Sequence, residues 1–243
     1  MAEPPSSSPD DIVKRYGLQP LPDNVVELTR LVARQEVVSD LIAKVIAKDK
    51  ALTAHLLRFA NPRAESVEEY NITTVGDALT RVGMAPVILL AMHDPLTRAV
   101  VKAFEMFCLP VTPAPLQKLA SITGPHVLGV VEFSGKAAGV VYVRLEPSVA
   151  QRLAAAIIGA RPEELTTLSE IDDVIGELVN IVAGNLKSNL CDTGITCALT
   201  VPKVSRTDDF KIKTVAGGVS ERLGFAAADL RAFVDVSVNP WNA

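Results

Sequence analysis

Apolar residues in the first third of the chain recur every three or four positions, as they do along one face of an amphipathic helix. Each run follows a polar residue whose side chain can accept hydrogen bonds from the start of a helix. The candidate N-caps are Asp23 or Asn24, Ser39, Asp49, and Thr73 or Thr74. Asn61-Pro62 and Gly83 are expected to end two of these helices. No alternating strand pattern occurs here, so residues 12–91 are predicted to form a string of short helices.

A different pattern begins near Asp94, where runs rich in β-branched and aromatic residues occur between helical segments. Residues 127–133 and 139–145 flank Ser134-Gly135-Lys136, an arrangement typical of a β-hairpin. The other predicted elements are helices over 95–107, 147–158 and 170–190 and strands over 195–201, 210–219 and 233–238. This order of helices and strands indicates the α+β fold class.

The composition is that of a globular protein with a substantial core, since 49% of the 243 residues are apolar and 21% are charged. Acidic and basic residues are mixed and the formal net charge is −4, whereas nucleic-acid binding needs clustered Lys and Arg. We therefore expect no nucleic-acid partner. No N-terminal apolar run follows a basic segment, so we expect no signal peptide. No apolar run is long enough to span a bilayer, so we also expect no membrane insertion.

The three cysteines show neither CxxC nor Cys/His spacing and are expected to be free thiols in a reducing, cytoplasmic environment. Residues 1–11 are rich in Pro and Ser with little to bury, and they are predicted to be a disordered tail.

The predicted helix over 170–190 carries the most informative side chains. At 3.6 residues per turn its apolar residues share one face, while Glu177 and Asn180, three residues apart, project together from the opposite face. Asn is a poor residue for a helix interior, and each Gly weakens a helix by roughly 1 kcal/mol relative to Ala. Asn180, Gly176 and Gly184 therefore favour a face that another protein approaches closely, although an ordinary solvated face is the alternative at this point.

The segments GELVNIVAGNLKSNL and TVPKVSRTDDFKI resemble the CheX form of the CheC/CheX/FliY phosphatases of bacterial chemotaxis. The motif of that family is Asp or Ser, three residues, Glu, two residues, Asn, and a proline some twenty-two residues on. In this chain it reads Asp173, Glu177, Asn180 and Pro202, with the last spacing one residue short. CheC has two such helices, whereas one motif is found here, as in CheX.

This resemblance implies dephosphorylation of the aspartyl phosphate of a CheY-like response-regulator receiver. By position, Asn180 matches the asparagine whose amide orients a water for in-line attack, and Glu177 matches the glutamate that reaches the receiver's lysine beside the phosphate. Asp173, Gly184 and Asn185 are expected to contact the partner. The resemblance also implies an antiparallel sheet packed by long helices, a homodimer, and no cofactor of the chain's own, since the Mg2+ is expected in the receiver's site.

Three N-terminal segments, LQPLPDNVVELTRLV, AKDKALTAHLLRFANP and NITTVGDALTRVGM, resemble the HDOD domain, a catalytically silent relative of the HD phosphohydrolases. Only about its first half is expected, over residues 12–91, followed by a CheX/CheC-like domain over 92–243. A truncated module of this kind favours docking or regulation. A non-catalytic adaptor that docks a receiver or another signalling protein is therefore the alternative to a phosphatase.

His93-Asp94 spells the residue pair that names the HD hydrolases. A working metal site needs further His and Asp ligands from separate helices, and the chain has three histidines in all: His55, His93 and His126. We predict no metal site from the sequence.

Overall fold

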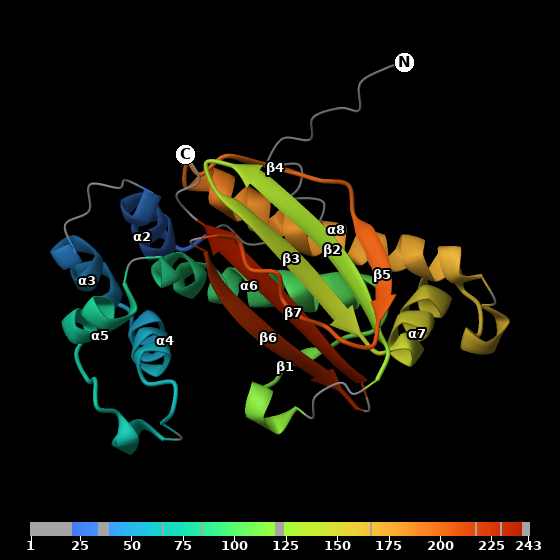
Figure 1. The fold of residues 1–243 in the computed structure, drawn as a ribbon, viewed down its shortest axis with the longest axis horizontal. Helices are drawn as coiled ribbons and strands as arrows, with labels where there is room; N and C mark the ends of the chain where they lie inside the picture. Colours follow the sequence, from blue (N-terminus) through green and yellow to red (C-terminus); the bar gives the residue numbers. More distant parts are fainter. Residues whose placement is uncertain are drawn as a thin grey trace, which may run out of the picture.

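The computed structural model describes residues 21–33, 39–64, 66–83, 85–119, 124–165, 167–216, 218–228 and 230–239. The predicted tail over residues 1–11 lies outside the described residues. The protein has the predicted α+β fold: helices α2 to α5 gather at one end, and an antiparallel sheet with long helices on one face forms the rest (Figure 1).

The N-terminal part consists of short helices, as predicted. They are α2 (Asp23–Ala33), α3 (Ser39–Ala47), α4 (Lys50–Ala60) and α5 (Val75–Val82), with a 3-10 turn at Val67–Glu69. Two predicted caps are confirmed, since the Asp49 side chain accepts bonds from two backbone amides of α4 and the Thr74 side chain accepts one from α5. Gly83 ends α5 with a φ of 76°, a conformation that favours glycine.

Helix α6 (Pro86–Met106) joins the two parts of the molecule. It contacts α2 and α4 among the N-terminal helices, and it also contacts the long helix α8 (Leu168–Asp192) and the sheet strand β6 (Val219–Ala227). The predicted helix over 95–107 is only the second half of α6, because the helix continues through Pro95. Burial of apolar side chains in both halves of α6 offsets the loss of helix stability, about 3 kcal/mol, that a proline inside a helix causes.

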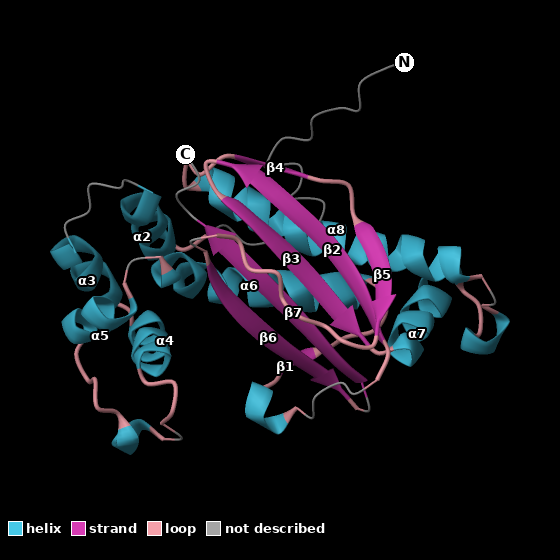
Figure 2. Ribbon diagram, viewed as in Figure 1, coloured by secondary structure: helices cyan, strands magenta, loops and turns pink. Residues whose placement is uncertain are grey.

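The strands pair antiparallel in the order β1-β6-β7-β3-β2-β4, and β5 also pairs with β2 (Figure 2). The remaining strands are β1 (Thr112–Pro113), β2 (His126–Gly135), β3 (Ala138–Leu145), β4 (Cys197–Leu199), β5 (Lys203–Thr207) and β7 (Leu230–Asn239). The hairpin predicted around Ser134-Gly135-Lys136 is confirmed as β2 and β3.

The predicted strand over 210–219 is wrong, because strand structure begins only at Val219. The residues before it cross one face of the sheet (Figure 1). There the ring of Phe210 packs edge-on against Tyr142 at 5.3 Å, and the guanidinium of Arg144 lies 5.0 Å from its centroid. Phe210 is thus covered by packing of a loop on a sheet rather than by strand pairing.

A buried ion pair lies on this same face of the sheet. The carboxylate of Asp235 is fully buried, with the Nε atom of Arg222 at 2.5 Å and that of Arg144 at 3.8 Å. Burial raises the pKa of Asp235, although the hydrogen bond and charge of Arg222 oppose that shift. The two guanidinium groups compensate part of the cost of burying this carboxylate.

Helices α6 and α8 cover the other face of the sheet, with α7 (Pro147–Ile158) at one end (Figure 2). Gly129 of β2 lets α8 approach closely, because a Cβ built on it would lie 3.0 Å from the Cβ of Val179. Helix α8 contributes a row of buried apolar residues to this interface: Ile171, Val174, Ile175, Leu178, Val179, Ile181, Val182, Leu186 and Leu190. Burial of these side chains fixes which face of α8 remains in contact with solvent.

Within the described residues, no single helix is both long and apolar enough to cross a bilayer. The neighbouring helices α5 and α6 meet the criterion only when taken as one sharply bent pair.

Candidate functional site

Helix α8 presents a narrow polar stripe to solvent. At about 100° per residue, Asp173, Glu177, Asn180 and Gly184 fall within about 60° of one another around the helix axis. Asp173 and Glu177 are exposed, and Asn180 and Gly184 are partly exposed. The three polar side chains make no hydrogen bond or ion pair with other described residues. The carboxylates and the amide are therefore available to a ligand or partner.

Asn185 does not belong to this stripe, contrary to our expectation that it contacts a partner. Its side chain is 2% exposed, and its amide nitrogen donates to the backbone oxygen of Ile181 at 2.8 Å. One residue beyond Gly184 is a rotation of about 100°, which carries Asn185 into the buried arc of α8. A partner docked on the stripe has no access to this amide.

The connection between β4 and β5 forms one edge of the stripe. A Cβ built on Gly176 would lie 3.8 Å from the Cβ of Pro202 and 3.9 Å from a methyl carbon of Val204. Next to this contact, Val201 is 81% exposed. An apolar residue this exposed, in the connection that packs against Gly176, adds a hydrophobic element at the edge of the polar surface.

An ion pair fastens the first turns of α8 to β5. The two guanidinium nitrogens of Arg206 lie 2.8 Å and 3.1 Å from the two carboxylate oxygens of Asp172. The Nη1 atom of Arg206 donates a hydrogen bond to Oδ2 of Asp172, and the second contact brings the opposite charges close without meeting hydrogen-bond geometry. Sequence reasoning did not identify this pair, because its partners come from separate elements. Alternation along β5, which turns Val204 and Arg206 to the same side, is the signal that could have found it.

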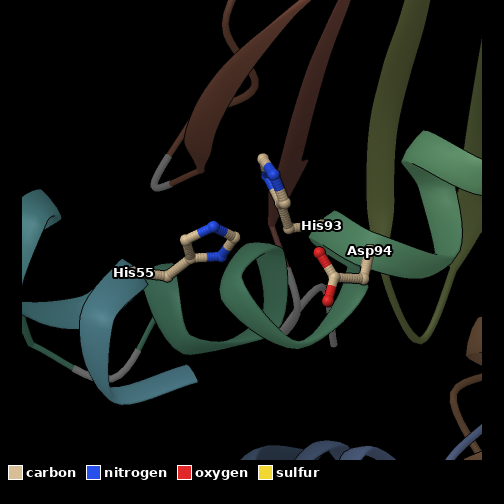
Figure 3. A group of neighbouring side chains, drawn as sticks. All are labelled: His55, His93 and Asp94. Carbon is tan, nitrogen blue, oxygen red and sulfur yellow. The ribbon is translucent and has the colours of Figure 1, made fainter. Parts of the chain in front are cut away.

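The stripe contains groups that can orient a water and bind a cation, but no serine or cysteine nucleophile. Among the described residues, the one group of His, Cys, Asp and Glu side chains spaced to hold a metal ion lies elsewhere: His55, His93 and Asp94 (Figure 3). Chemistry on the stripe therefore depends on what a partner brings to it.

The second part of the chain has the fold of the CheX/CheC class of α+β domains. Residues 127–225 match the family model of the chemotaxis phosphatase CheX, and residues 18–108 match the model of the HDOD domain. The chain thus joins a CheX-like domain to an HDOD-like helical segment, as the sequence resemblance predicted.

Solved structures agree with this assignment at the level of the fold. The chemotaxis protein CheX from Vibrio vulnificus is 21% identical with a TM-score of 0.52, and the match covers 60% of this chain and 97% of that one. A CheC-like superfamily protein from Shewanella sp. PV-4 is 20% identical with a TM-score of 0.51, covering 61% of this chain and 97% of that one. CheX from Desulfovibrio desulfuricans is 19% identical with a TM-score of 0.50, covering 61% and 99%. A comparison with the curated proteins finds no match.

Proposed function

We propose that this protein dephosphorylates the aspartyl phosphate of a CheY-like response-regulator receiver, using Glu177 and Asn180 on α8. The observation that carries the proposal is the shared, unpartnered exposure of these two side chains on the helix that resembles the CheX motif. The match to the family model of the chemotaxis phosphatase CheX supports it.

The proposed chemistry needs little from this chain beyond positioning. An acyl phosphate is reactive, so a water held in line with the bond to be broken supplies much of the rate enhancement. The Asn180 amide would hold this water, and the Glu177 carboxylate would bind the receiver's lysine next to the phosphate. The water oxygen then bonds to phosphorus, the bond from phosphorus to the aspartyl oxygen breaks, and inorganic phosphate, a free aspartate and one proton are released. The Mg2+ would be held by the receiver.

The surroundings of the two residues suit a protein partner. Apart from the backbone of α8 itself, no atom of the described residues lies within 4 Å of the position where a Cβ on Gly184 would be, so the helix is open to close approach there. Val201, in the connection between β4 and β5, offers an exposed apolar contact. Asp173 extends the acidic surface toward a partner whose active site carries a lysine and a metal ion, an arrangement that favours encounter between opposite charges. We include homodimerisation in the proposal on the strength of the family resemblance.

The test uses CheY-like receivers from the same organism that have been phosphorylated with acetyl phosphate in the presence of Mg2+. The decay of their aspartyl phosphate is then measured. We expect the wild-type protein to accelerate the decay. Asn180→Ala should reduce the catalysed rate about 100-fold, because loss of one oriented donor in an active site costs that order of magnitude. Glu177→Ala should weaken catalysis as well.

Two matched variants control for nonspecific effects. Glu163→Ala removes an exposed carboxylate outside α8, and Asn189→Ala removes an amide on α8 away from the stripe. Both should keep wild-type activity. If no receiver loses phosphate faster, yet binding persists in Asn180→Ala and Glu177→Ala, the phosphatase proposal fails. The non-catalytic adaptor would then be the better account.

A further inference from the structure

Three side chains from two separate segments of the sequence meet where the N-terminal helices adjoin the sheet. His55 comes from α4, and His93 and Asp94 come from α6 (Figure 3). One potential ligand atom from each residue lies within 4.8 Å of those of the other two. The two imidazole rings are perpendicular neighbours, with centroids 4.2 Å apart and planes at 76°. Two nitrogen ligands and one oxygen ligand thus converge from two helices.

A fourth residue fixes the orientation of one imidazole. The Nδ1 atom of His93 lies 2.6 Å from a carboxylate oxygen of Glu221 on β6, and both side chains are largely buried. When Nδ1 carries the proton and donates it to Glu221, the Nε2 lone pair of His93 is free to bind a cation. A carboxylate that holds the second nitrogen of a histidine is the usual outer partner of a metal-ligating imidazole. The other carboxylate oxygen of Glu221 is buried and has no hydrogen-bond partner among the described residues.

We propose that His55, His93 and Asp94 bind a divalent transition-metal ion and that Glu221 orients His93 from the second layer. Two imidazoles and one carboxylate suit Zn2+ and its neighbours in the first transition row, whereas Mg2+ and Ca2+ prefer oxygen ligands alone. This inference is independent of the function proposed for α8.

The distances allow the site to close around an ion. Ligand atoms about 2.1 Å from a tetrahedral Zn2+ lie about 3.4 Å from one another. The ligand atoms of the three residues lie up to 4.8 Å apart in the structure. Binding therefore requires side-chain rotations that move these atoms by on the order of 1 Å. Asp94 is exposed, so solvent can reach the ion and supply a further ligand.

The position of the site suggests what the ion does. It would join α4 to α6 and, through Glu221, would link both helices to β6. These are the elements at which the HDOD-like helices meet the CheX-like sheet. Metal binding would accordingly stabilise the contact between the two parts, because an ion that binds only the folded state raises the free energy of unfolding.

The test uses the full chain, stripped with a chelator and titrated with Zn2+ while thermal unfolding and heat of binding are followed. We expect one equivalent of Zn2+ per chain and a higher unfolding temperature. Asp94→Asn should weaken binding by at least about tenfold, and Glu221→Gln by about 10- to 100-fold. Because Asp94 is exposed, Asp94→Asn tests the site even if His55→Ala does not fold.

Two controls separate this site from other Zn2+ ligands. Glu163→Gln, a change to an exposed carboxylate elsewhere, and Cys191→Ser should both bind as wild type. Co2+ as a spectroscopic probe should show nitrogen and oxygen ligation without a thiolate charge-transfer band. The proposal is overturned if the wild type takes up no Zn2+, if Asp94→Asn and His55→Ala bind as wild type, or if a thiolate band appears and is lost in Cys191→Ser.

Discussion

Gly176 of α8 lies against Pro202, so that a Cβ added to the glycine would be 3.8 Å from the Cβ of the proline. Asn180 is four residues further along the helix, on nearly the same side as Gly176. The connection that carries Pro202 therefore flanks the Asn180 side of the stripe. This contact brings the proline of the family motif next to the helix that carries Asp173, Glu177 and Asn180.

The contact predicts a difference between a small and a large substitution at Gly176. Gly176→Ala adds a methyl group at ordinary van der Waals distance and should stabilise the protein by about 1 kcal/mol, through higher helix propensity. Gly176→Leu should displace Pro202 and weaken receiver binding while α8 stays helical. Urea unfolding and receiver titration measure the two effects. Receiver affinity equal to wild type in Gly176→Leu would show that the position of Pro202 does not matter for docking.

Gly184→Ala should separate stability from partner binding. The new methyl group meets open space, so the free energy of unfolding should rise by about 1 kcal/mol. If a receiver approaches the backbone of α8 there, the same methyl group should lower its affinity. Denaturant unfolding and titration with a receiver provide the comparison, with Gly176→Ala as the matched control. A variant that is more stable and binds equally well would mean that the partner does not approach Gly184.

Much of the fold is readable from local pattern. The caps at Asp49 and Thr74, the β2–β3 hairpin and the exposed pair Glu177 and Asn180 all follow from residue type and periodicity. Each of these features is decided within a few residues of the chain. The same periodicity places Asn185 on the buried side of α8. The expectation that Asn185 contacts a partner came from assigning the residue to the stripe, and the pattern itself did not predict it.

Other features depend on contacts between distant segments, which no local pattern contains. Packing of α6 against both parts of the molecule carries that helix through Pro95, a residue that usually ends helices. Phe210 is covered by Tyr142 and Arg144 of β3, so its loop segment needs no strand pairing. His55 and His93 meet only because α4 packs beside α6, and the sequence gives no sign of that pairing.

Gly129→Ala should disturb the packing of α8 against the sheet. The added Cβ would lie 3.0 Å from the Cβ and Cγ1 of Val179 and 3.2 Å from a methyl carbon of Ile175, so the helix must shift. Overpacking of this kind typically costs about 1–3 kcal/mol. The double variant Gly129→Ala/Val179→Ala should recover part of that loss, because it removes the atoms that clash. A double-mutant cycle from urea unfolding measures the coupling, and strictly additive losses would contradict the close contact.

The thiol of Cys197 should be alkylated slowly in the folded protein. Burial raises its pKa to about 11, and the neighbouring Cys191 adds to the shift. At pH 8 the thiolate fraction, and with it the alkylation rate, should be about 100-fold lower than for the same thiol in the urea-unfolded chain. The rate should then rise about tenfold for each pH unit until the pH reaches the raised pKa.

The raised pKa also has a consequence for stability. Between the ordinary thiol pKa and about 11, the folded state keeps a proton that the unfolded state loses, so this thiol makes the protein less stable as the pH rises through that window. Iodoacetamide labelling read by peptide mass spectrometry measures the rates, with the exposed Cys108 as the internal control. Cys197→Val should remove this contribution to the pH dependence of unfolding. Rapid native labelling of Cys197 at pH 8 would show that its sulfur is not shielded by the contact between β4 and α8.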